Sequence, residues 1–374
     1  MRAALAQGDG AGVARAYAGY RAQLSGDDDK ALLRELAIAT LGQALASPSV
    51  KLKVIAIEAV EAAELQPLAE KVGERMTDDD DRVAATAAIA VLHGFPQAPQ
   101  VAGDMLRSEN AEARRIAVEG VGKKVGRLAL ADLEKAAADP DARVRRAATR
   151  WLGQLKDTGA AELLTRHLRD PDDAVRAAAA SALARIGAPN LAELARQALA
   201  DDRDPIVATE AAIARGGGPS AAQALERAAA SAEWTVRAGA ANISVRAAGK
   251  DAAVALARRL ATDPEPAVRL AAARVLAHAG DLAAAAALFV AALASPDLAL
   301  QAATDLASQN DDRGTRALEA AVTNAALGQL DRAAAAAAHR TAHKITPGLV
   351  AALADDAGIV RVEAAAALAM LSRR

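Results

Sequence analysis

Three segments of the sequence follow one pattern: DPDARVRRAATRWL at 139–152, DPDDAVRAAAASAL at 170–183 and DPEPAVRLAAARVL at 263–276. Each has the form D-P-x-x-x-V-R-x-A-A-x-x-x-L. Apolar residues stand at the valine and three, four, seven and eight positions later, which places them on one face of a 3.6-residue helical period. The pattern therefore predicts an amphipathic helix that recurs along the chain.

The valine of this pattern marks a repeat of nearly constant length. Equivalent positions are spaced 29 to 32 residues apart and fall at Leu52, Val83, Ala113, Val144, Val175, Val207, Val236, Val268, Leu300, Leu330 and Val360. Self-similarity at a fixed period of this size is typical of solenoid proteins, in which each repeat contacts only its neighbours. We therefore expect a stack of about ten repeats.

The start of each repeat helix is also marked. Ser or Asp stands five residues before ten of the eleven anchor positions, as in Asp139 and Asp170, and we interpret these residues as helix N-caps. Proline follows at 48, 140, 171, 264 and 296, where the first helical position tolerates it. A second helix completes each unit, as at 160–168, 191–199, 221–229 and 252–260, after turns expected at Gly187, 216–218 and Gly249.

The repeats divide the chain into two parts. We expect an atypical helical cap at 1–46, with helices at 11–24 and 28–46, and a solenoid at 47–374. Its repeats start near 47, 78, 108, 139, 170, 201, 231, 263, 295 and 325, with a final half repeat from 355. Since the half repeat lacks a second helix, its exposed end is expected to be covered by a partner or by residues beyond the chain.

The spacing and the D-P-x-x-x-V-R-x-A-A motif resemble the HEAT-like repeats of the phycobilisome-lyase type over residues 47–374. The resemblance implies an all-α fold, a right-handed α-solenoid of two-helix repeats of about 31 residues. The family includes chromophore lyases, an iron hydroxylase, adaptors and scaffolds, so the resemblance constrains the fold more than the function.

Composition narrows the function classes. The 45 Lys and Arg nearly balance the 47 Asp and Glu, so no global field attracts nucleic acid or anionic lipid. The absence of cysteine excludes disulfides, a thiolate nucleophile and Cys-based zinc sites. No motif for a cofactor is found, and none is expected. The alanine and arginine usage favours a bacterial source. The start of the chain resembles no signal peptide, so we expect a cytoplasmic protein, or a periplasmic or lipoprotein one if a leader has been removed.

One arginine follows the anchor in most repeats, namely Arg114, Arg145, Arg176, Arg237, Arg269 and Arg361. An evenly spaced row of guanidinium groups would suit a phosphate backbone. The alternative, which we favour, is a structural ladder between repeats, in which each arginine bonds acids or carbonyls of the adjacent repeat.

A basic cluster and the histidines are two further candidate sites, for nucleic acid and for a metal ion. A basic cluster contains Arg143, Arg145, Arg146 and Arg150, with Lys123, Lys124 and Arg127 before it, but aromatic platforms for nucleic-acid bases are lacking. The histidines lack the His-Glu pairs that the resemblance associates with the iron hydroxylase. His339 and His343 would share one helix face, which leaves a metal site one or two ligands short.

The sequence therefore favours a non-catalytic scaffold or adaptor that binds an unidentified protein or peptide on a concave face formed by the second helices. The alternatives are a phycobilin-lyase-like handler of a chromophore or ligand, and a nucleic-acid-binding protein of the same fold. The uncharged run LAAAAALFVAALA at 282–294 is too short to cross a membrane. Its Leu288, Phe289 and Val290 are candidate partner-binding residues, unless Phe289 fills the core. The oligomeric state is left open.

Overall fold

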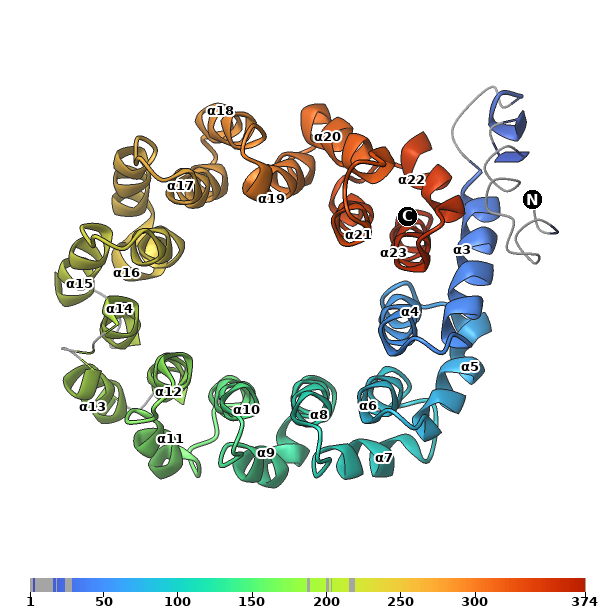
Figure 1. Cartoon of the computed structure of the whole chain (residues 1–374). Helices are drawn as coiled ribbons and strands as arrows, with labels where there is room; N and C mark the ends of the chain where they lie inside the picture. The colour runs from blue at the N-terminus through green and yellow to red at the C-terminus, as the bar shows by residue number, and fades with distance from the viewer. Residues whose placement is uncertain are drawn as a thin grey trace. The chain divides into compact units, whose positions relative to one another are not determined.

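A computed structural model describes residues 3, 16–17, 19–23, 29–186, 189–199, 202, 204–214 and 219–373. Within these ranges every regular element is an α-helix or a short 3₁₀ helix (Figure 1). None of the described helices is both long and apolar enough to span a bilayer. The expected turns at Gly187 and 216–218, the repeat start at 201 and most of the 1–28 segment lie outside the described residues. The chain is an all-α solenoid, as the repeats predict.

Two compact units make up the chain. Unit 1 combines Met1–Ala102 with Phe289–Arg374, and unit 2 is Gly103–Leu288. The helices of unit 1 are α3 (Lys30–Leu45), α4 (Val50–Ala62), α5 (Ala69–Glu74), α6 (Asp81–Ala90), α19 (Pro296–Ser308), α20 (Asp312–Thr323), α21 (Gln329–Ala338), α22 (Pro347–Ala351) and α23 (Gly358–Leu371). Short 3₁₀ helices occur at Gln66–Leu68, Arg75–Thr77, His339–Thr341 and Ala352–Ala354.

Unit 2 contains α8 (Ala111–Lys124), α9 (Leu130–Ala136), α10 (Ala142–Gln154), α11 (Ala161–His167), α12 (Asp173–Ile186), α13 (Pro189–Leu199), α14 (Pro205–Ala214), α15 (Pro219–Ala229), α16 (Trp234–Leu260) and α17 (Pro266–Ala279), with a 3₁₀ helix at Gly126–Ala129. The boundaries between the units fall in α7 (Ala98–Met105) and α18 (Leu282–Ala292). The expected turn at Gly249 is a kink inside α16, where this glycine has a φ of 81°.

The helix starts differ from the sequence prediction. Asp139 accepts a hydrogen bond from the backbone N–H of Asp141 at 2.8 Å, and Asp141 is the residue that caps α10. At most repeat starts the predicted caps therefore lie two residues too early. The exception is Ser295, which is confirmed as the N-cap of α19, and of the predicted N1 prolines only Pro296 begins a helix. The physical reason is that the Asp-Pro segment forms a turn ahead of the helix, which leaves the aspartate free to bond the preceding repeat.

In unit 2 the helices form two rows. Figure 1 shows α8, α10, α12 and α14 on the inner side of its curve and α9, α11, α13 and α15 on the outer side. The concave face is thus formed by the first helices of the repeats and not, as predicted, by the second helices. Small residues allow neighbouring first helices to approach closely: a Cβ placed on Gly153 of α10 would lie 2.5 Å from Cα of Ala182 in α12.

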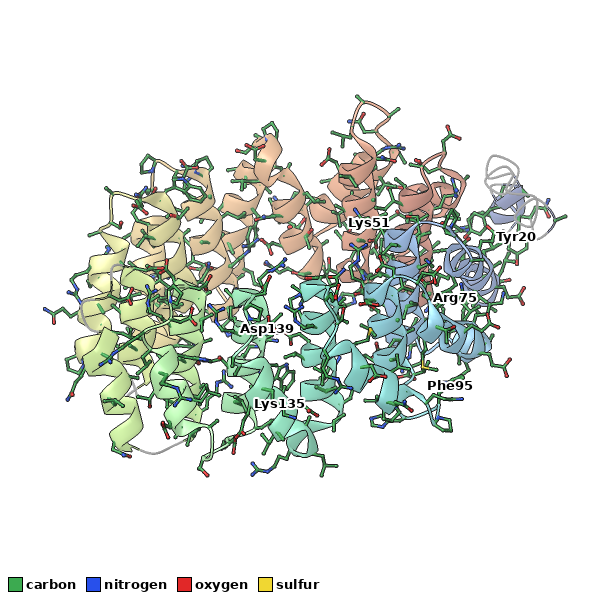
Figure 2. All side chains as sticks on the ribbon, turned by 60° about the horizontal axis from the view of Figure 1, so that its bottom comes forward. Tyr20, Lys51, Arg75, Phe95, Lys135 and Asp139 are labelled. Carbon is green, nitrogen blue, oxygen red and sulfur yellow. The ribbon has the colours of Figure 1, made fainter. Side chains whose placement is uncertain are left out.

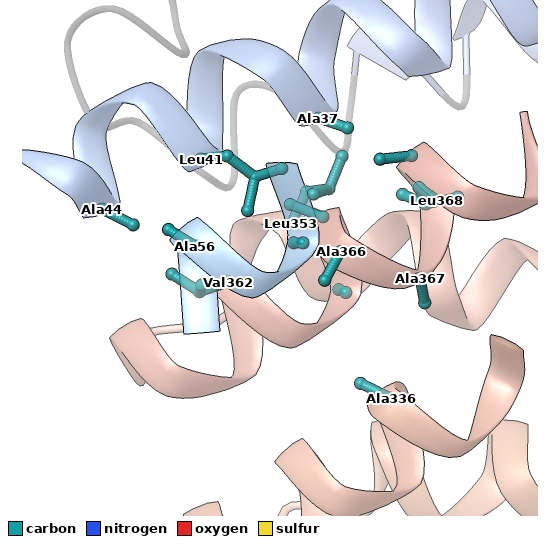
Figure 3. Packing of buried hydrophobic residues seen from close by; sticks show 14 of the residues in the cluster. Ala37, Leu41, Ala44, Ala56, Ala336, Leu353, Val362, Ala366, Ala367 and Leu368 are labelled. Atoms are coloured by element: carbon teal, nitrogen blue, oxygen red, sulfur yellow. The ribbon is translucent and has the colours of Figure 1, made fainter. Parts of the chain in front are cut away.

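The final half repeat of unit 1 is covered by the start of the chain. Helix α23 packs against α3 and α4, and residues of all three share one buried cluster. Figure 3 shows Ala37 and Leu41 of α3 in this cluster with Ala366 and Leu368 of α23. Arg34 reinforces it by donating to the carbonyl oxygens of Ala369 and Ala63, at 3.3 and 3.2 Å.

This packing corrects two expectations. The end of the last half repeat is not exposed, because α3 lies where a second helix would be, and repeats distant in sequence do contact each other. The reason is in the composition of α23, whose residues 364–369 are all buried alanine or leucine. Such a helix is apolar nearly all round and must be enclosed on more than one side.

Candidate interaction surface

The repeated arginines bridge successive repeats. Arg145 donates from Nε and Nη2 to the two carboxylate oxygens of Asp170, both at 2.8 Å. Its Nη1 donates to the carbonyl oxygens of Asp139 and Pro140, both at 3.0 Å. Asp139, labelled in Figure 2, in turn receives Arg114 of the preceding repeat. The guanidinium thus holds its own helix-start turn and the equivalent turn of the next repeat.

The same arrangement recurs along unit 2. It consists of the pairs Arg114–Asp139, Arg145–Asp170, Arg176–Asp202 and Arg237–Asp263. The side chains in these pairs retain at most 15% of their accessible surface. The hydrogen bond from Arg237 lowers the pKa of Asp263, although burial of the carboxyl acts in the opposite direction. Because their donors are engaged within the chain, we interpret these arginines as structural residues and not as a row of phosphate contacts.

Three positions show variants of the ladder. Lys53 replaces the arginine and pairs with Asp78. Arg269 donates to the carbonyl oxygens of Asp263 and Pro264 at 2.6 and 2.9 Å, and Ser295 stands where the next repeat would supply its aspartate. Arg361 likewise bonds the carbonyl oxygens of Asp355 and Asp356 in the last half repeat.

The predicted basic cluster is divided by the structure. Arg145 belongs to the ladder, Arg143 pairs with Asp141, and Arg127 bonds the carbonyl oxygen of Leu155. Only Arg146 and Arg150 of this cluster line a common cavity, together with arginines of other helices. The arrangement does not form a continuous basic groove.

This cavity, the arginine basin, is lined by Arg146 and Arg150 of α10, Arg185 of α12 and Arg246 of α16. Its volume is about 290 Å³ and its remaining lining is Ser181 and alanines of α12. Sequence reasoning missed Arg185 and Arg246. The available signal was their spacing, since each lies ten residues after the anchor of its repeat.

An apolar groove lies in unit 1. It is lined by Leu293, Pro296, Asp297, Ala299, Leu300, Ala303, Ala317, Leu318, Ala320, Ala321, Leu327 and Asp331, and has a volume of about 550 Å³. We call it the α19–α20 groove. Leu318 is fully buried at its base, whereas Leu327 retains 37% and the nearby Leu330 57% of their accessible surface. The groove therefore presents apolar surface to solvent, which the sequence analysis did not identify.

The predicted partner residues of α18 have different surroundings. Phe289 is completely buried, which supports its interpretation as a core residue. Leu288 and Val290 are half-buried, so for these two residues partner binding stays a prediction. The most exposed large side chain of α18 is Leu282, at 52%.

The histidines occupy structural positions or lie apart. His339 is buried, with Nδ1 2.9 Å from the carbonyl oxygen of Ala335 and Nε2 3.3 Å from Oγ1 of Thr346. It does not share a helix face with His343, because α21 ends at Ala338 and His343 has a φ of 51°. Among the described residues, no three His, Cys, Asp or Glu side chains are grouped so that they could hold a metal ion.

Paired helices, ion pairs between successive pairs and the lack of strands in the described ranges define a protein of stacked helical repeats. A family model described as HEAT repeats matches residues 99–178, 130–216 and 170–246. The part of the chain from 99 to 246 therefore matches HEAT repeats.

Several solved structures are similar in fold. The complex of CpcE and CpcF of phycocyanin lyase from Nostoc sp. is 22% identical over 68% of this chain and 90% of that chain, with a TM-score of 0.34. An engineered protein is 20% identical over 92% and 99%, with a TM-score of 0.34. The karyopherin Kap121p bound to the SUMO protease Ulp1p is 15% identical over 88% of this chain and 45% of that chain, with a TM-score of 0.31. No curated protein matches the chain.

Proposed function

We propose that this chain is a non-catalytic interaction scaffold or adaptor that binds a protein or peptide on the surface of its repeats. The observation that carries the proposal is the α19–α20 groove, in which Leu327 is exposed and Leu293 and Leu300 are half-buried. Exposed apolar surface of this kind marks interaction sites, and stacked repeats provide extended surfaces for partners. The groove is rimmed by the carboxylates of Asp297 and Asp331, which would orient a bound segment.

The groove also favours a second candidate function. Its volume of about 550 Å³ lies within the range of small-molecule sites, about 300 to 1,000 Å³. A chromophore- or ligand-handling protein would use the same apolar walls to enclose its ligand. The two functions predict different molecules bound to the purified chain. A scaffold would retain a protein, whereas a ligand handler would retain a small molecule that is identified by its mass and absorbance.

The test begins with affinity purification of the full chain from its host and mass spectrometry of both proteins and small molecules that remain bound. A recovered protein partner is then produced recombinantly and its binding to Leu327→Glu is measured. The matched control is Leu128→Glu, because Leu128 is a leucine of unit 2 with 91% of its surface exposed. We expect Leu327→Glu to weaken binding at least tenfold at an unchanged Tm, with no effect of the control. A bound small molecule and no protein partner would contradict the scaffold and support the ligand handler.

A further inference from the structure

The arginine basin concentrates positive charge on the inner face of unit 2. Its lining contains four guanidinium groups and no carboxylate, although the whole sequence is nearly neutral. Three of these arginines come from the inner helices α10 and α12, and the fourth comes from α16. Such a grouping is electrostatically unfavourable unless an anion is bound or the groups serve another purpose.

One arginine of the basin is held in place by its neighbours. Arg150 forms a short ion pair with Glu119 of α8 and lies over the ring of Trp151, 5.9 Å from its centroid. Trp151 donates its indole N–H to the same Glu119 carboxylate oxygen at 2.8 Å. One oxygen of Glu119 therefore holds both Arg150 and Trp151, and the indole N–H of Trp151 is engaged.

Two arginines of the basin have no partner among the described residues. Within the described part of the chain, Arg146 and Arg185 form neither an ion pair nor a hydrogen bond, and both side chains are exposed. This distinguishes them from the arginines of the ladder, whose donors are satisfied by aspartates and carbonyls. A guanidinium presents up to five donors in a planar fork that matches a carboxylate.

The floor of the basin limits what can enter. It is formed by Ala174, Ala177, Ala178 and Ala182 with the hydroxyl of Ser181, so small side chains leave room for short anionic groups between the guanidiniums. A volume of about 290 Å³ suits one or two carboxylate side chains. Hydrogen bonds between a guanidinium and a carboxylate are charge-assisted, and a bidentate pair is among the stronger polar contacts in proteins.

Neighbouring acids argue for a peptide and against a nucleic acid. On the helices α8 and α10, Glu112 pairs with Arg115 and Asp141 pairs with Arg143, so acids interrupt the cations there. Continuous tracking of a phosphate backbone needs an unbroken row of cations and aromatic platforms, whereas a short acidic segment needs only this local group.

We propose that the arginine basin binds the carboxylate side chains of an acidic segment of a partner protein, with Arg146 and Arg185 as the principal contacts. This inference rests on the proposed function, since it names the chemistry of one partner surface. Arg150 serves as a fixed third cation. The basin lies in unit 2 and is lined by residues other than those of the α19–α20 groove, so each surface is testable by itself.

The probe is a fluorescein-labelled peptide of eight alternating Asp and Glu residues, and the measurement is fluorescence anisotropy with the full chain in 50 mM salt. We expect saturable binding that Arg146→Ala and Arg185→Ala each weaken about tenfold, because each substitution removes a charge-assisted contact and strands no acid. The matched control is Arg166→Ala on the outer helix α11, where Arg166 is 63% exposed and, within the described ranges, pairs with Glu162 alone. The control should bind as the wild type does.

Two further probes decide the identity of the ligand. A peptide of eight Asn and Gln residues should not bind, and the charge reversal Arg146→Glu/Arg185→Glu should transfer binding to a peptide of eight lysines. Equal affinity of the wild type and both alanine variants for the acidic peptide would overturn the proposal. Tighter, Arg146-dependent binding of a single-stranded oligonucleotide would overturn it in favour of nucleic acid. Unchanged recovery of a natural partner by these variants refutes the basin alone, whereas failure to recover any partner refutes the scaffold.

Discussion

The two forms of the repeat arginine allow its contribution to be measured within one protein. Arg145 bonds both the carboxylate of Asp170 and two carbonyl oxygens, whereas the bonds of Arg269 to described residues go to two carbonyl oxygens and to no carboxylate. We expect Arg145→Ala to destabilise the chain more than Arg269→Ala does. The comparison isolates the ion pair, because both arginines hold the turn at the start of their own repeat.

The magnitudes follow from what each substitution leaves behind. Arg145→Ala strands the carboxylate of Asp170, whose side chain is only 7% exposed, and removing one partner of a buried pair costs about 3 to 5 kcal/mol. Since Arg145 itself retains 15% exposure, water reaches the site and we expect about 2 to 4 kcal/mol. Arg269→Ala removes only hydrogen bonds to carbonyls, for which we expect about 1 kcal/mol.

Urea denaturation gives the total loss of unfolding free energy, and hydrogen exchange of the α10 and α12 amides localises it, since repeat proteins open in segments. The double variant Arg145→Ala/Asp170→Asn provides a control, because it removes the stranded charge while an amide oxygen still faces the backbone N–H of Asp172. It should recover about 1 kcal/mol of the loss. Equal destabilisation by Arg145→Ala and Arg269→Ala would refute the structural account of the ion pair.

Three other predictions concern pH and helix α18. Burial lowers the pKa of His167 and of His339, so near pH 6.5 the unfolded chain takes up protons that the folded chain does not. The free energy of unfolding should therefore fall as the pH drops from 7 to 5, which the midpoints of urea denaturation would show. His339→Gln should reduce that fall. The hydrogen bond from Arg143 lowers the pKa of Asp141 to about 2, so the stability that this carboxylate contributes above pH 3.8 is lost as the pH falls toward 2. In Asp141→Asn, the free energy of unfolding should therefore decrease less steeply over this pH range than in the wild type. Phe289→Ala should lower the free energy of unfolding, measured by urea denaturation, by about 3 to 5 kcal/mol because the ring is fully buried. Ala287→Glu, on the exposed side of α18, should leave the Tm unchanged. If Leu288 and Val290 contact the partner, this second variant should also weaken recovery of the partner.

The helical period and the ladder motif were visible in the sequence because both depend on residues close together in the chain. The position of the helix start was less visible. Asp139 and Asp141 are both good cap residues, and their choice depends on Arg114, which comes from the preceding repeat and occupies Asp139. A local pattern cannot distinguish the two aspartates, because the deciding bond is made between repeats.

The arginine basin and the α19–α20 groove, our candidate interaction surfaces, could be predicted only in part for a related reason. Arg146 and Arg150 stand close together in the sequence, but Arg185 and Arg246 reach the same basin from other repeats. Isolated arginines on alanine-rich helices carry no signal unless positions are compared at the period of the repeat. The α19–α20 groove has even less signal, since Leu293, Leu300 and Leu327 look like ordinary core residues of their own helices.

The contact between α3 and α23 shows where repeat reasoning reaches its limit. A half repeat must bury its apolar face against another segment, and the alanines and leucines of α23 predict that this helix is enclosed. The sequence does not predict which segment covers α23, because α3 lacks the repeat motif and lies over 300 residues earlier in the chain. Helix α3 can cover α23 because it has an apolar face of its own, in which Leu33, Leu36 and Leu41 are buried. Its Arg34 also donates hydrogen bonds to a carbonyl oxygen just after α4 and to one in α23. The helix that breaks the repeat pattern therefore acts as the missing half of the repeat that the chain leaves incomplete.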